Sequence, residues 1–449
     1  MEQKSGSVKL ILSIVIALLI VGGAWYLTRQ NPEDKKTLEN VSSSDNLITD
    51  SIVDSSSSKT DTKKTTTKQN TTTQNNKSTT TTAAGKTTTT KKTTVATTKA
   101  PSVTYPTKTS PILSFYNLTS EQKEVYYKLS DAINNGTSNI PIDETITPDQ
   151  LKETYSLAKN LNYYSVNAPM SFTYSYYSQS GIITSVKLDL PFSKSVGDSK
   201  TAALKSKVNS IKASIPKTSD YDKIKYIHDY IINNCRYNYN AVSNSDAYPT
   251  AFTAYGALVE GSAVCEGYAK AFSLLCNEVG VDALLVIGTG KSEPHMWNMV
   301  KCNGQWYHMD VTWDDATLNG SDSIGYSYFN VTTAQIKTDH VIENSSLNVP
   351  FASATAANYY YYNGLVASSY TQAKAIVLAE AKKDISGGEK VIRIKAANLS
   401  VKNEIYNKML CNNGDIFRIL DQALGSKTFS SVRSSSSANY EIDIRYIVN

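Results

Sequence analysis

An Asn-Gly pair, Asn303-Gly304, sets the pairing of the segment around it. Asn-Gly between runs of alternating apolar residues is the strongest short-range signal for a two-residue hairpin turn, and residues 295–312 have this pattern. Such a turn places Trp297 opposite Asp310. His295 and Asp310 then share one face of the hairpin as diagonal neighbours, roughly 7–8 Å apart at the backbone. The sequence therefore predicts that these two side chains meet.

An imidazole beside a carboxylate has the arrangement of an oriented base. Asp310 can accept the Nδ1 proton of His295 and fix its tautomer, and the same register sets His295 opposite Thr312. His308 lies on the same face nearer the turn and stays open as a rival base. The opposite face is predicted to point into the core, because it carries these apolar residues: Met296, Val300, Tyr307, Met309 and Val311.

A metal site is the weaker interpretation of this hairpin. Cys302, His308 and Asp310 offer three kinds of ligand, but no pair among them has the spacing that is usual for zinc. His228 lies on another predicted amphipathic helix, over residues 219–232. A lone histidine in such a place is interpreted as structural or as a surface residue. We therefore predict no metal centre.

Cys265 follows a loop of small residues, 261–264, and begins a predicted helix. Apolar residues recur from Cys265 at the three-and-four spacing of one helix face, and Gly280 marks the end. A thiol on the first turn of a helix feels the positive end of the macrodipole, which favours thiolate. Free cysteine is also among the most buried residue types. The helix alone thus leaves two interpretations open, a core residue and a nucleophile.

The order of Cys265, His295 and Asp310 along the chain favours the interpretation of Cys265 as a nucleophile. A thiol at a helix start and a base oriented by a carboxylate on a hairpin are the parts of nucleophilic catalysis. The stretches around them resemble the core of the transglutaminase-like superfamily, and the likeness continues towards residue 340. The stretches that carry this resemblance are residues 263–272, 295–298, 306–315 and 328–333.

The resemblance implies a papain-like α+β core in which a cysteine helix packs on an antiparallel sheet. It also implies that Cys265, His295 and Asp310 form a catalytic triad for thioacyl chemistry on an amide, without a metal or other cofactor. It leaves the acceptor open, either an amine or water. An aromatic residue before the nucleophile often completes the oxyanion hole in this superfamily, and three tyrosines are candidates: Tyr237, Tyr239 and Tyr255.

Residues 1–29 are predicted to reach a membrane. The apolar run 10–27 follows basic residues, and eighteen helical residues rise about 27 Å, close to a hydrocarbon core of about 30 Å. Trp25 and Tyr26 favour an uncleaved anchor, because aromatic residues gather at membrane interfaces. A cleaved signal peptide is the alternative. Either reading places the rest of the chain outside the cytoplasm.

Residues 30–110 are predicted to be a disordered linker. Thr occupies nineteen of the forty positions from 61 to 100, and almost nothing there can form a core. The same stretch holds eight Lys and one Asp, so it carries +7, and the net charge of +5 leaves −2 for the rest of the chain. The folded part is close to neutral, which argues against a nucleic-acid partner.

Three folded regions are predicted after the linker. Residues 111–215 form an N-terminal α+β region, 216–345 the transglutaminase-like core and 346–449 a small α+β domain. In the last region the tyrosines at 358–362 are interpreted as a strand. The chain as a whole is predicted to belong to the α+β class.

The function predicted from these parts is that of a membrane-anchored, extracytoplasmic thiol enzyme. Its expected partners are proteins or peptides at the cell surface or wall, and hydrolysis is slightly favoured over cross-linking. The alternative is a non-catalytic surface scaffold that keeps the fold for binding only. An intact set of Cys265, His295 and Asp310 argues against the scaffold.

Overall fold

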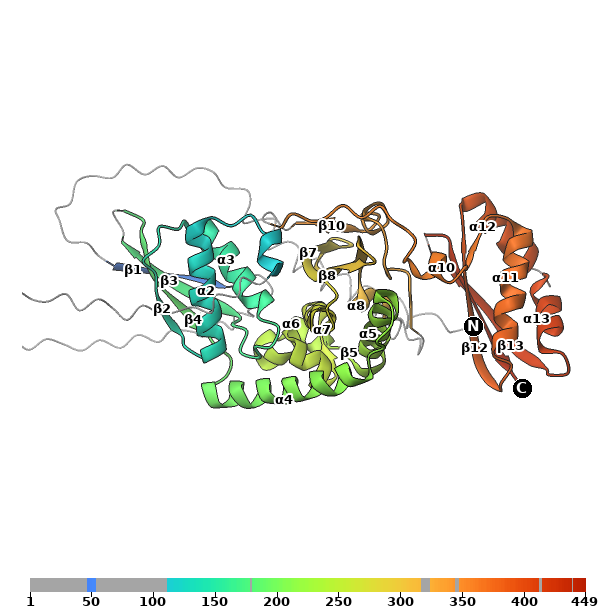
Figure 1. The fold of residues 1–449 in the computed structure, drawn as a ribbon, viewed down its shortest axis with the longest axis horizontal. Helices are drawn as coiled ribbons and strands as arrows, with labels where there is room; N and C mark the ends of the chain where they lie inside the picture. Colours follow the sequence, from blue (N-terminus) through green and yellow to red (C-terminus); the bar gives the residue numbers. More distant parts are fainter. Residues whose placement is uncertain are drawn as a thin grey trace, which may run out of the picture. The chain divides into compact units, whose positions relative to one another are not determined.

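The computed structural model describes residues 47–53, 111–177, 180–315, 324–343, 347–411, 414–437 and 439–449 (Figure 1). The predicted anchor at 1–29 and most of the predicted linker at 30–110 lie outside these residues. None of the helices in the described part of the chain is both long and apolar enough to cross a membrane. Seven residues depart from the prediction of a disordered linker, because Leu47–Val53 form strand β1.

Residues 111–215 combine a short 3₁₀ turn, three helices and most of a four-stranded sheet. These elements are Pro111–Phe115 (3₁₀), α2 (Ser120–Asn135), β2 (Asn139–Pro141), α3 (Pro148–Leu161), β3 (Ser171–Tyr177), β4 (Ile183–Asp189) and α4 (Lys194–Ser214). The antiparallel sheet has the order β1-β3-β4-β2. Thr119 and Thr147 start α2 and α3 with capping boxes, which satisfy backbone donors at each helix start. The two helices lie side by side and pack on this sheet (Figure 1).

Residues 216–345 hold the cysteine helix and a second antiparallel sheet, of order β10-β7-β8-β9. The predicted α+β class is confirmed. The elements up to the cysteine helix are α5 (Asp220–Asn234), β5 (Arg236–Tyr237), α6 (Tyr239–Ser243), short turns at Ser245–Ala247, Pro249–Phe252 and Gly256–Glu260, β6 (Ser262–Ala263) and α7 (Cys265–Glu278). The elements after it are β7 (Ala283–Gly290), β8 (Glu293–Cys302), β9 (Gln305–Met309), α8 (Val311–Asp314), α9 (Thr333–Ile336) and β10 (His340–Ile342).

Strand β8 is buried on both faces. Met296 and Val300 point into a core shared with α5 and α7, as predicted for the apolar face of the hairpin. Trp297 and Met299 point the other way, into a core built with α2, α3, β3 and β4. The N-terminal region therefore covers the second face of the sheet that carries His295. Removing it would expose Trp297, which is 1% exposed in the folded chain.

The predicted turn at Asn303-Gly304 is confirmed. Both residues have positive φ, 49° and 79°, as a type I′ turn requires. Cys302 pairs with Gln305, so the predicted register holds next to the turn.

Further from the turn the hairpin departs from the prediction. Pairing ends at Met309, and Asp310 becomes the N-cap of α8, where its side chain accepts from two backbone N–H groups. An aspartate that caps a helix competes with strand extension. The predicted pairing of His295 with Thr312 is therefore wrong. His295 pairs on the other edge of β8, with Gly288 of β7.

Residues 347–449 include a third sheet, of order β11-β12-β14-β13. Helices α11 and α13 of the same region lie side by side (Figure 1). The elements are α10 (Tyr359–Tyr362), β11 (Val366–Ala367), α11 (Tyr370–Lys383), β12 (Gly388–Ala396), α12 (Leu399–Ile405) with a wider turn at Tyr406–Leu410, α13 (Ile416–Leu424), β13 (Phe429–Ser436) and β14 (Glu441–Val448). The strand predicted at 358–362 is wrong. Asn358 accepts from the Tyr360 N–H and begins a helical turn there.

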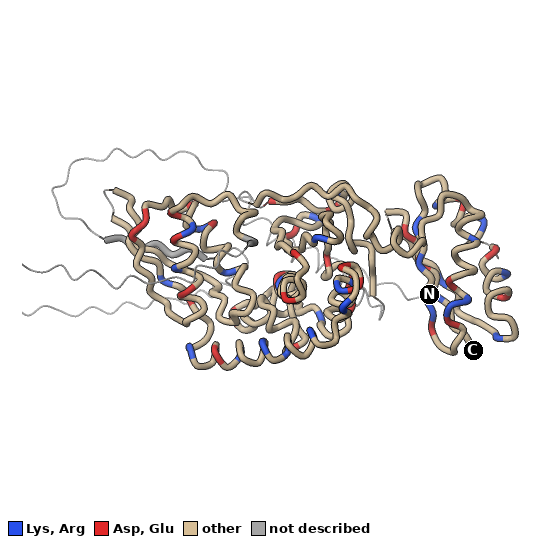
Figure 2. Tube along the Cα trace, viewed as in Figure 1, with Lys and Arg blue, Asp and Glu red and all other residues tan. Residues whose placement is uncertain are grey.

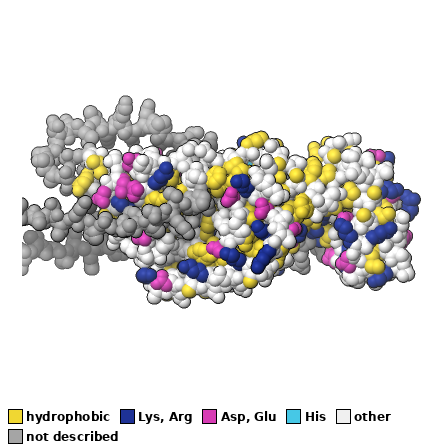
Figure 3. Space-filling model, in the orientation of Figure 1, with side chains coloured by type: hydrophobic (Ala, Val, Ile, Leu, Met, Phe, Trp, Pro, Cys, Tyr) yellow, Lys and Arg dark blue, Asp and Glu magenta, His cyan; other side chains and the backbone are white. Residues whose placement is uncertain are grey.

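Charges of both signs are interspersed along the described elements (Figure 2). Helix α4 carries mainly positive charge, with five Lys and one Asp. Two of these lysines are paired, Lys194 with Asp198 and Lys212 with Glu278. On the face seen in Figure 3, hydrophobic side chains lie in small groups among polar and charged ones. The absence of a nucleic-acid partner stays a prediction.

Candidate active site

Cys265 is the first residue of α7, and its side chain is partly exposed, whereas three of the other four cysteines are buried. Val264 at the N-cap supplies no side-chain acceptor, so the first N–H groups of α7 have no side-chain cap. Gly267 allows the first turn to approach the backbone beneath it, because a Cβ there would lie 2.5 Å from the Ala251 carbonyl oxygen. The thiol therefore sits at a helix N-terminus, where the N–H dipoles favour negative charge.

Buried polar contacts fix α7 against the strand that carries the base. Asn298 of β8 donates through Nδ2 to the Ala269 carbonyl at 3.0 Å and to Ser273 Oγ at 2.9 Å. Tyr268 Oη donates to Asp315 Oδ2 at 2.8 Å, beyond the end of α8. Buried hydrogen bonds of this kind are costly to break. These contacts link the helix, the strand and the turn after Asp310.

His295 and Asp310 meet as predicted, through a different ring nitrogen. His295 Nε2 lies 2.7 Å from Asp310 Oδ2, whereas the sequence analysis assigned this contact to Nδ1. The other oxygen, Oδ1, accepts from the backbone N–H groups of Thr312 and Trp313 at 3.0 and 3.1 Å. The side chain of Cys265 is a neighbour of His295 and helps to raise the pKa of its ring. Because Nε2 faces the carboxylate, Nδ1 is the nitrogen left for the thiol.

The environment of His295 keeps its ring protonated. Burial opposes the charged form, but the Asp310 carboxylate, with help from Cys265, raises the pKa of His295 to about 10. For Asp310, burial raises the pKa, but His295 and then His340 outweigh it and hold the pKa of this carboxyl well below its usual range. At neutral pH the pair is an imidazolium beside a carboxylate.

Two of the three candidate tyrosines lie at this site. Strand β5 pairs Tyr237 with Ala263, two residues before Cys265. Burial and then the neighbouring Cys265 raise the pKa of Tyr237. Tyr239 is 64% exposed and packs edge-on against Tyr237, with ring centroids 5.0 Å apart. Tyr255 is placed elsewhere, beneath the ammonium of Lys200 at 4.6 Å from its ring centre.

A small cleft opens over His295. Its volume is about 150 Å³, and its walls are mostly aromatic or polar. The residues that line it are Tyr237, Tyr239, Gly290, Glu293, Pro294, His295, Thr312 and Trp313. Tyr255 is not among them. The cleft gives a substrate carbonyl access to the imidazole of His295, and Cys265 is not among the residues that line it.

His308, the rival base, does not reach the cysteine. It is fully buried, its Nδ1 accepts from the Trp297 indole N–H at 3.2 Å, and its Nε2 lies 3.2 Å from Thr333 Oγ1. Burial, followed by the charges of His340 and Lys337, lowers the pKa of His308 to about 3. A neutral histidine with both nitrogens engaged is a structural residue.

The predicted alternative of a metal site on Cys302, His308 and Asp310 does not form. Within the described ranges, the one group of metal-ligand type is His295, Asp310 and His340, whose ligand atoms lie within 4.8 Å of one another. These atoms already contact each other at 2.7 and 3.1 Å. Zinc needs about 2.0–2.2 Å to each ligand, so the three would have to separate to admit an ion.

Sequence reasoning missed one residue of this site. His340 contacts Asp310 from β10, thirty residues later in the chain, and no local pattern links them. The one available signal was that the likeness to the superfamily continued to this residue. His228, interpreted as a structural or surface residue, is a structural one: it is fully buried between Asp229 and Asp314, at 2.9 and 3.2 Å, and does not line the cleft.

Gly290, at the floor of the cleft, supplies a test of this geometry. A Cβ there would lie 2.6 Å from Trp313 Cζ2 and 3.3 Å from His295 Cδ2. Such overpacking typically lowers the free energy of unfolding by about 1–3 kcal/mol. Here one of the side chains that must shift is that of His295, the base. We expect Gly290→Ala to lower kcat/KM about tenfold or more, because a small misplacement of a reacting group is costly. Kinetics and thermal unfolding together would check this.

The matched control is Gly387→Ala, whose nearest neighbour would be the Val448 carbonyl oxygen at 3.8 Å. It should leave kcat/KM unchanged. A Gly290→Ala protein with a lowered Tm and full kcat/KM would show that the glycine matters for packing alone.

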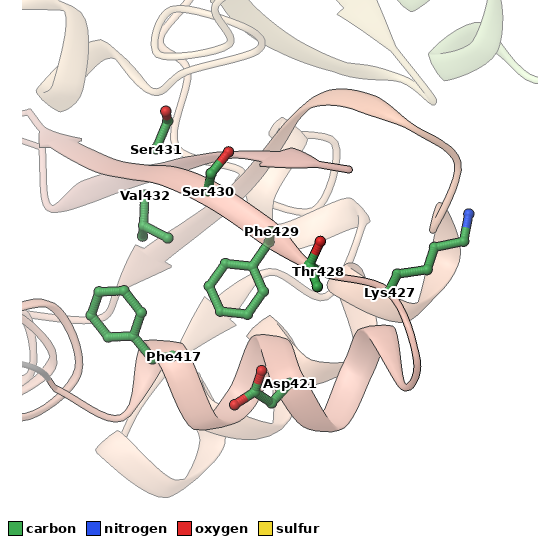
Figure 4. A pocket seen from close by; sticks show the side chains of 8 residues that line it. All are labelled: Phe417, Asp421, Lys427, Thr428, Phe429, Ser430, Ser431 and Val432. Atoms are coloured by element: carbon green, nitrogen blue, oxygen red, sulfur yellow. The ribbon is translucent and has the colours of Figure 1, made fainter.

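A larger cavity, of about 420 Å³, lies in the C-terminal domain between α13 and β13 (Figure 4). Phe417 and Phe429 stack near it, with ring centroids 6.3 Å apart, and Asp421 and Lys427 lie at its edge. It contains no histidine or cysteine. The smaller cleft over His295 is therefore the candidate active site.

Comparison with known proteins agrees with this choice. The transglutaminase-like superfamily matches residues 209–311 of the chain. This range includes Cys265, His295 and Asp310 and ends before His340. The fold is accordingly transglutaminase-like, an α+β core with the cysteine helix packed on an antiparallel sheet.

Two relatives share part of the sequence. Kyphoscoliosis peptidase of Mus musculus is 23% identical over 292 residues, which cover 59% of this chain and 44% of that protein. Kyphoscoliosis peptidase of Homo sapiens is 27% identical over 145 residues, covering 28% of this chain and 22% of that protein. The chain thus spans less than half the length of either relative. The crystal structure of a TGase is similar at 16% identity, over 39% of this chain and 50% of that one, with a TM-score of 0.23.

Proposed function

We propose that this chain, whose residues 209–311 form a domain of the transglutaminase-like superfamily, is a thiol enzyme that acts on peptide or side-chain amides. Its acyl intermediate would be a thioester on Cys265. The observation that carries the proposal is the 2.7 Å contact between His295 Nε2 and Asp310 Oδ2, with the side chain of Cys265 next to the same ring. A scaffold that only binds would have no use for an imidazole oriented in this way.

In the first half of the reaction, the thiolate of Cys265 attacks the amide carbonyl carbon. A C–S bond forms, and the carbonyl electron pair moves to oxygen. The Cys265 backbone N–H then stabilises the oxyanion, and the hydroxyl of Tyr237, which lines the cleft, is the candidate for a second donor. As the tetrahedral intermediate collapses, the C–N bond breaks and the leaving nitrogen takes the Nδ1 proton of His295. A free amine and a thioester result.

In the second half, His295 acts as the base. Its Nδ1 takes a proton from water, the hydroxide attacks the thioester, and the thiolate leaves. The products are a carboxylic acid and the restored thiolate–imidazolium pair. An amine in place of water would give a new amide. We favour water, because the two relatives carry the name peptidase.

We also propose that the enzyme is tethered to a membrane and works outside the cytoplasm, on proteins or peptides of the cell surface or wall. The support is the apolar run 10–27 with Trp25 and Tyr26 at its end. Alkaline extraction of membranes from expressing cells tests the tether. Recovery of the full-length protein in the soluble fraction would contradict it.

Glu293 at the cleft predicts a substrate preference. It is exposed, lines the cleft and lies near Tyr237. Lys291, on the same turn, holds its ammonium 4.8 Å from the centre of the Trp313 ring, so this rim accepts a cation. We expect Glu293→Gln to raise KM about 2- to 5-fold for a peptide with lysine beside the reactive amide, as for exposed ion pairs. A peptide with norleucine there should be unaffected; equal changes for both would refute the preference.

One incubation distinguishes water from an amine as the acceptor of the acyl group. The soluble region from about residue 111 is mixed with a protein substrate and a labelled primary amine. Cleavage fragments without label support hydrolysis, and label in high-mass products supports cross-linking. If neither appears and Cys265→Ala behaves like wild type, the scaffold is the better account.

A further inference from the structure

A second imidazole lies on the carboxylate of Asp310, and the mechanism above does not use it. His340 is 1% exposed, and its Nε2 lies 3.1 Å from Asp310 Oδ2. This is the same oxygen that His295 Nε2 reaches at 2.7 Å. On the far side of the ring, His340 Nδ1 lies 2.7 Å from Asp339 Oδ1. One carboxylate oxygen therefore contacts two imidazole rings.

Both ring nitrogens of His340 face carboxylate oxygens, and a carboxylate accepts hydrogen bonds. An imidazole nitrogen that bonds to such an oxygen does so as a donor. Asp339 also accepts from Tyr328 Oη at 2.6 Å. His340 is accordingly placed as a buried hydrogen-bond donor behind Asp310.

The fold holds the His340 ring in a closed aromatic surrounding. Strand β10 pairs His340 with Gly290 of β7, the glycine at the cleft. The centre of the His340 ring lies 4.3 Å from that of Trp313, 4.9 Å from Trp297 and 5.5 Å from Tyr328. Hydrogen bonds are stronger where water is excluded. The hydrogen bond from His340 to Asp310 is therefore little weakened by solvent.

We propose that His340 is a positioning residue of the proposed thiol enzyme, a buried hydrogen-bond donor that keeps Asp310 fixed towards His295. The inference rests on the proposed function. A carboxylate that already accepts from a second donor is a weaker base, so the Nε2 proton stays on His295. The His295 ring then keeps its orientation, with Nδ1 towards Cys265, through both halves of the reaction.

The test compares two substitutions of His340. Leucine removes the donor, whereas glutamine keeps one N–H donor for Asp310. We expect His340→Leu to lower kcat on a peptide substrate about 10- to 100-fold, as misplaced catalytic groups do. KM should change by less than about twofold, because His340 does not line the cleft. His340→Gln should recover most of the lost kcat.

The matched control is His308→Leu, which removes another buried histidine near Trp297 that makes no contact with Asp310. It should lower Tm but keep kcat. The proposal is overturned if His340→Leu keeps kcat, if leucine and glutamine lose it equally, or if both histidine variants lose it equally.

Alkylation of Cys265 by iodoacetamide at pH 6 separates this inference from the proposed function, because it needs no amide substrate. His340→Leu should slow it about tenfold, and His340→Gln less. A wild type that turns over no amide but shows this order would refute the proposed function and keep the positioning role. An unchanged alkylation rate in His340→Leu would refute the positioning role.

Discussion

Replacing Cys265 with alanine is expected to lower kcat on any amide substrate by roughly 10⁶-fold, the loss typical of removing a catalytic nucleophile. The residual rate would come from binding and from the oxyanion donor alone. The fold should persist, because Cys265 is partly exposed and its side chain is not part of a buried cluster. Steady-state kinetics with a peptide substrate, alongside thermal unfolding, would measure both effects.

Cys411→Ala is the matched control for this change, since Cys411 is the other partly exposed cysteine and lies in the C-terminal domain. It should keep full activity. Loss of activity in both variants, or in neither, would contradict the assignment of Cys265. Cys276 makes a poor control because it is fully buried in the core against α5 and the sheet.

Asp310→Asn is expected to lower kcat about 10⁴-fold, the size of effect seen when an oriented carboxylate beside a catalytic imidazole becomes an amide. The Asn oxygen can still accept from the Thr312 and Trp313 N–H groups, so α8 keeps its cap. The Asn nitrogen, however, would face two N–H donors, those of His295 and His340. Because two N–H donors cannot form a hydrogen bond with each other, the His295 ring would turn away from Cys265.

Asp310→Ala provides the comparison, because it also loses the cap, which costs typically about 1 kcal/mol. We expect the alanine variant to unfold at a lower temperature than the asparagine variant, with a similar loss of kcat. Wild-type kcat in Asp310→Asn would contradict the role of this carboxylate. Equal unfolding temperatures would contradict only the capping argument.

Local signals were enough to predict the parts of the site that lie close in sequence. The Asn303-Gly304 turn and the alternation around it specify the register, so His295 and Asp310 were brought together correctly. The helix that begins at Cys265 was visible in its apolar spacing. What failed was the end of the hairpin, where the capping side chain of Asp310 stops the strand before Thr312.

The parts that the sequence did not reveal depend on distant pairing. His340 reaches Asp310 through the pairing of β10 with β7, which follows from the whole sheet rather than from neighbouring residues. Strand β13 was also missed, because its serine-rich and largely exposed residues show no apolar alternation. Tyr360 was expected in a strand for its β-propensity, and one asparagine cap placed it in a helical turn. Distant pairing decided the first two of these places, whereas at Tyr360 one local signal outweighed another.

The central claim is that His295, held by Asp310, activates Cys265, and alkylation of this thiol at pH 6 tests it most directly. A model thiol is almost wholly protonated at that pH, whereas a cysteine beside an imidazolium reacts as thiolate. We predict that Cys265 reacts about 10- to 100-fold faster than the model thiol, and that His295→Ala removes the difference. If Cys265 in the folded protein reacts no faster than the model thiol, with or without His295, the claim is wrong.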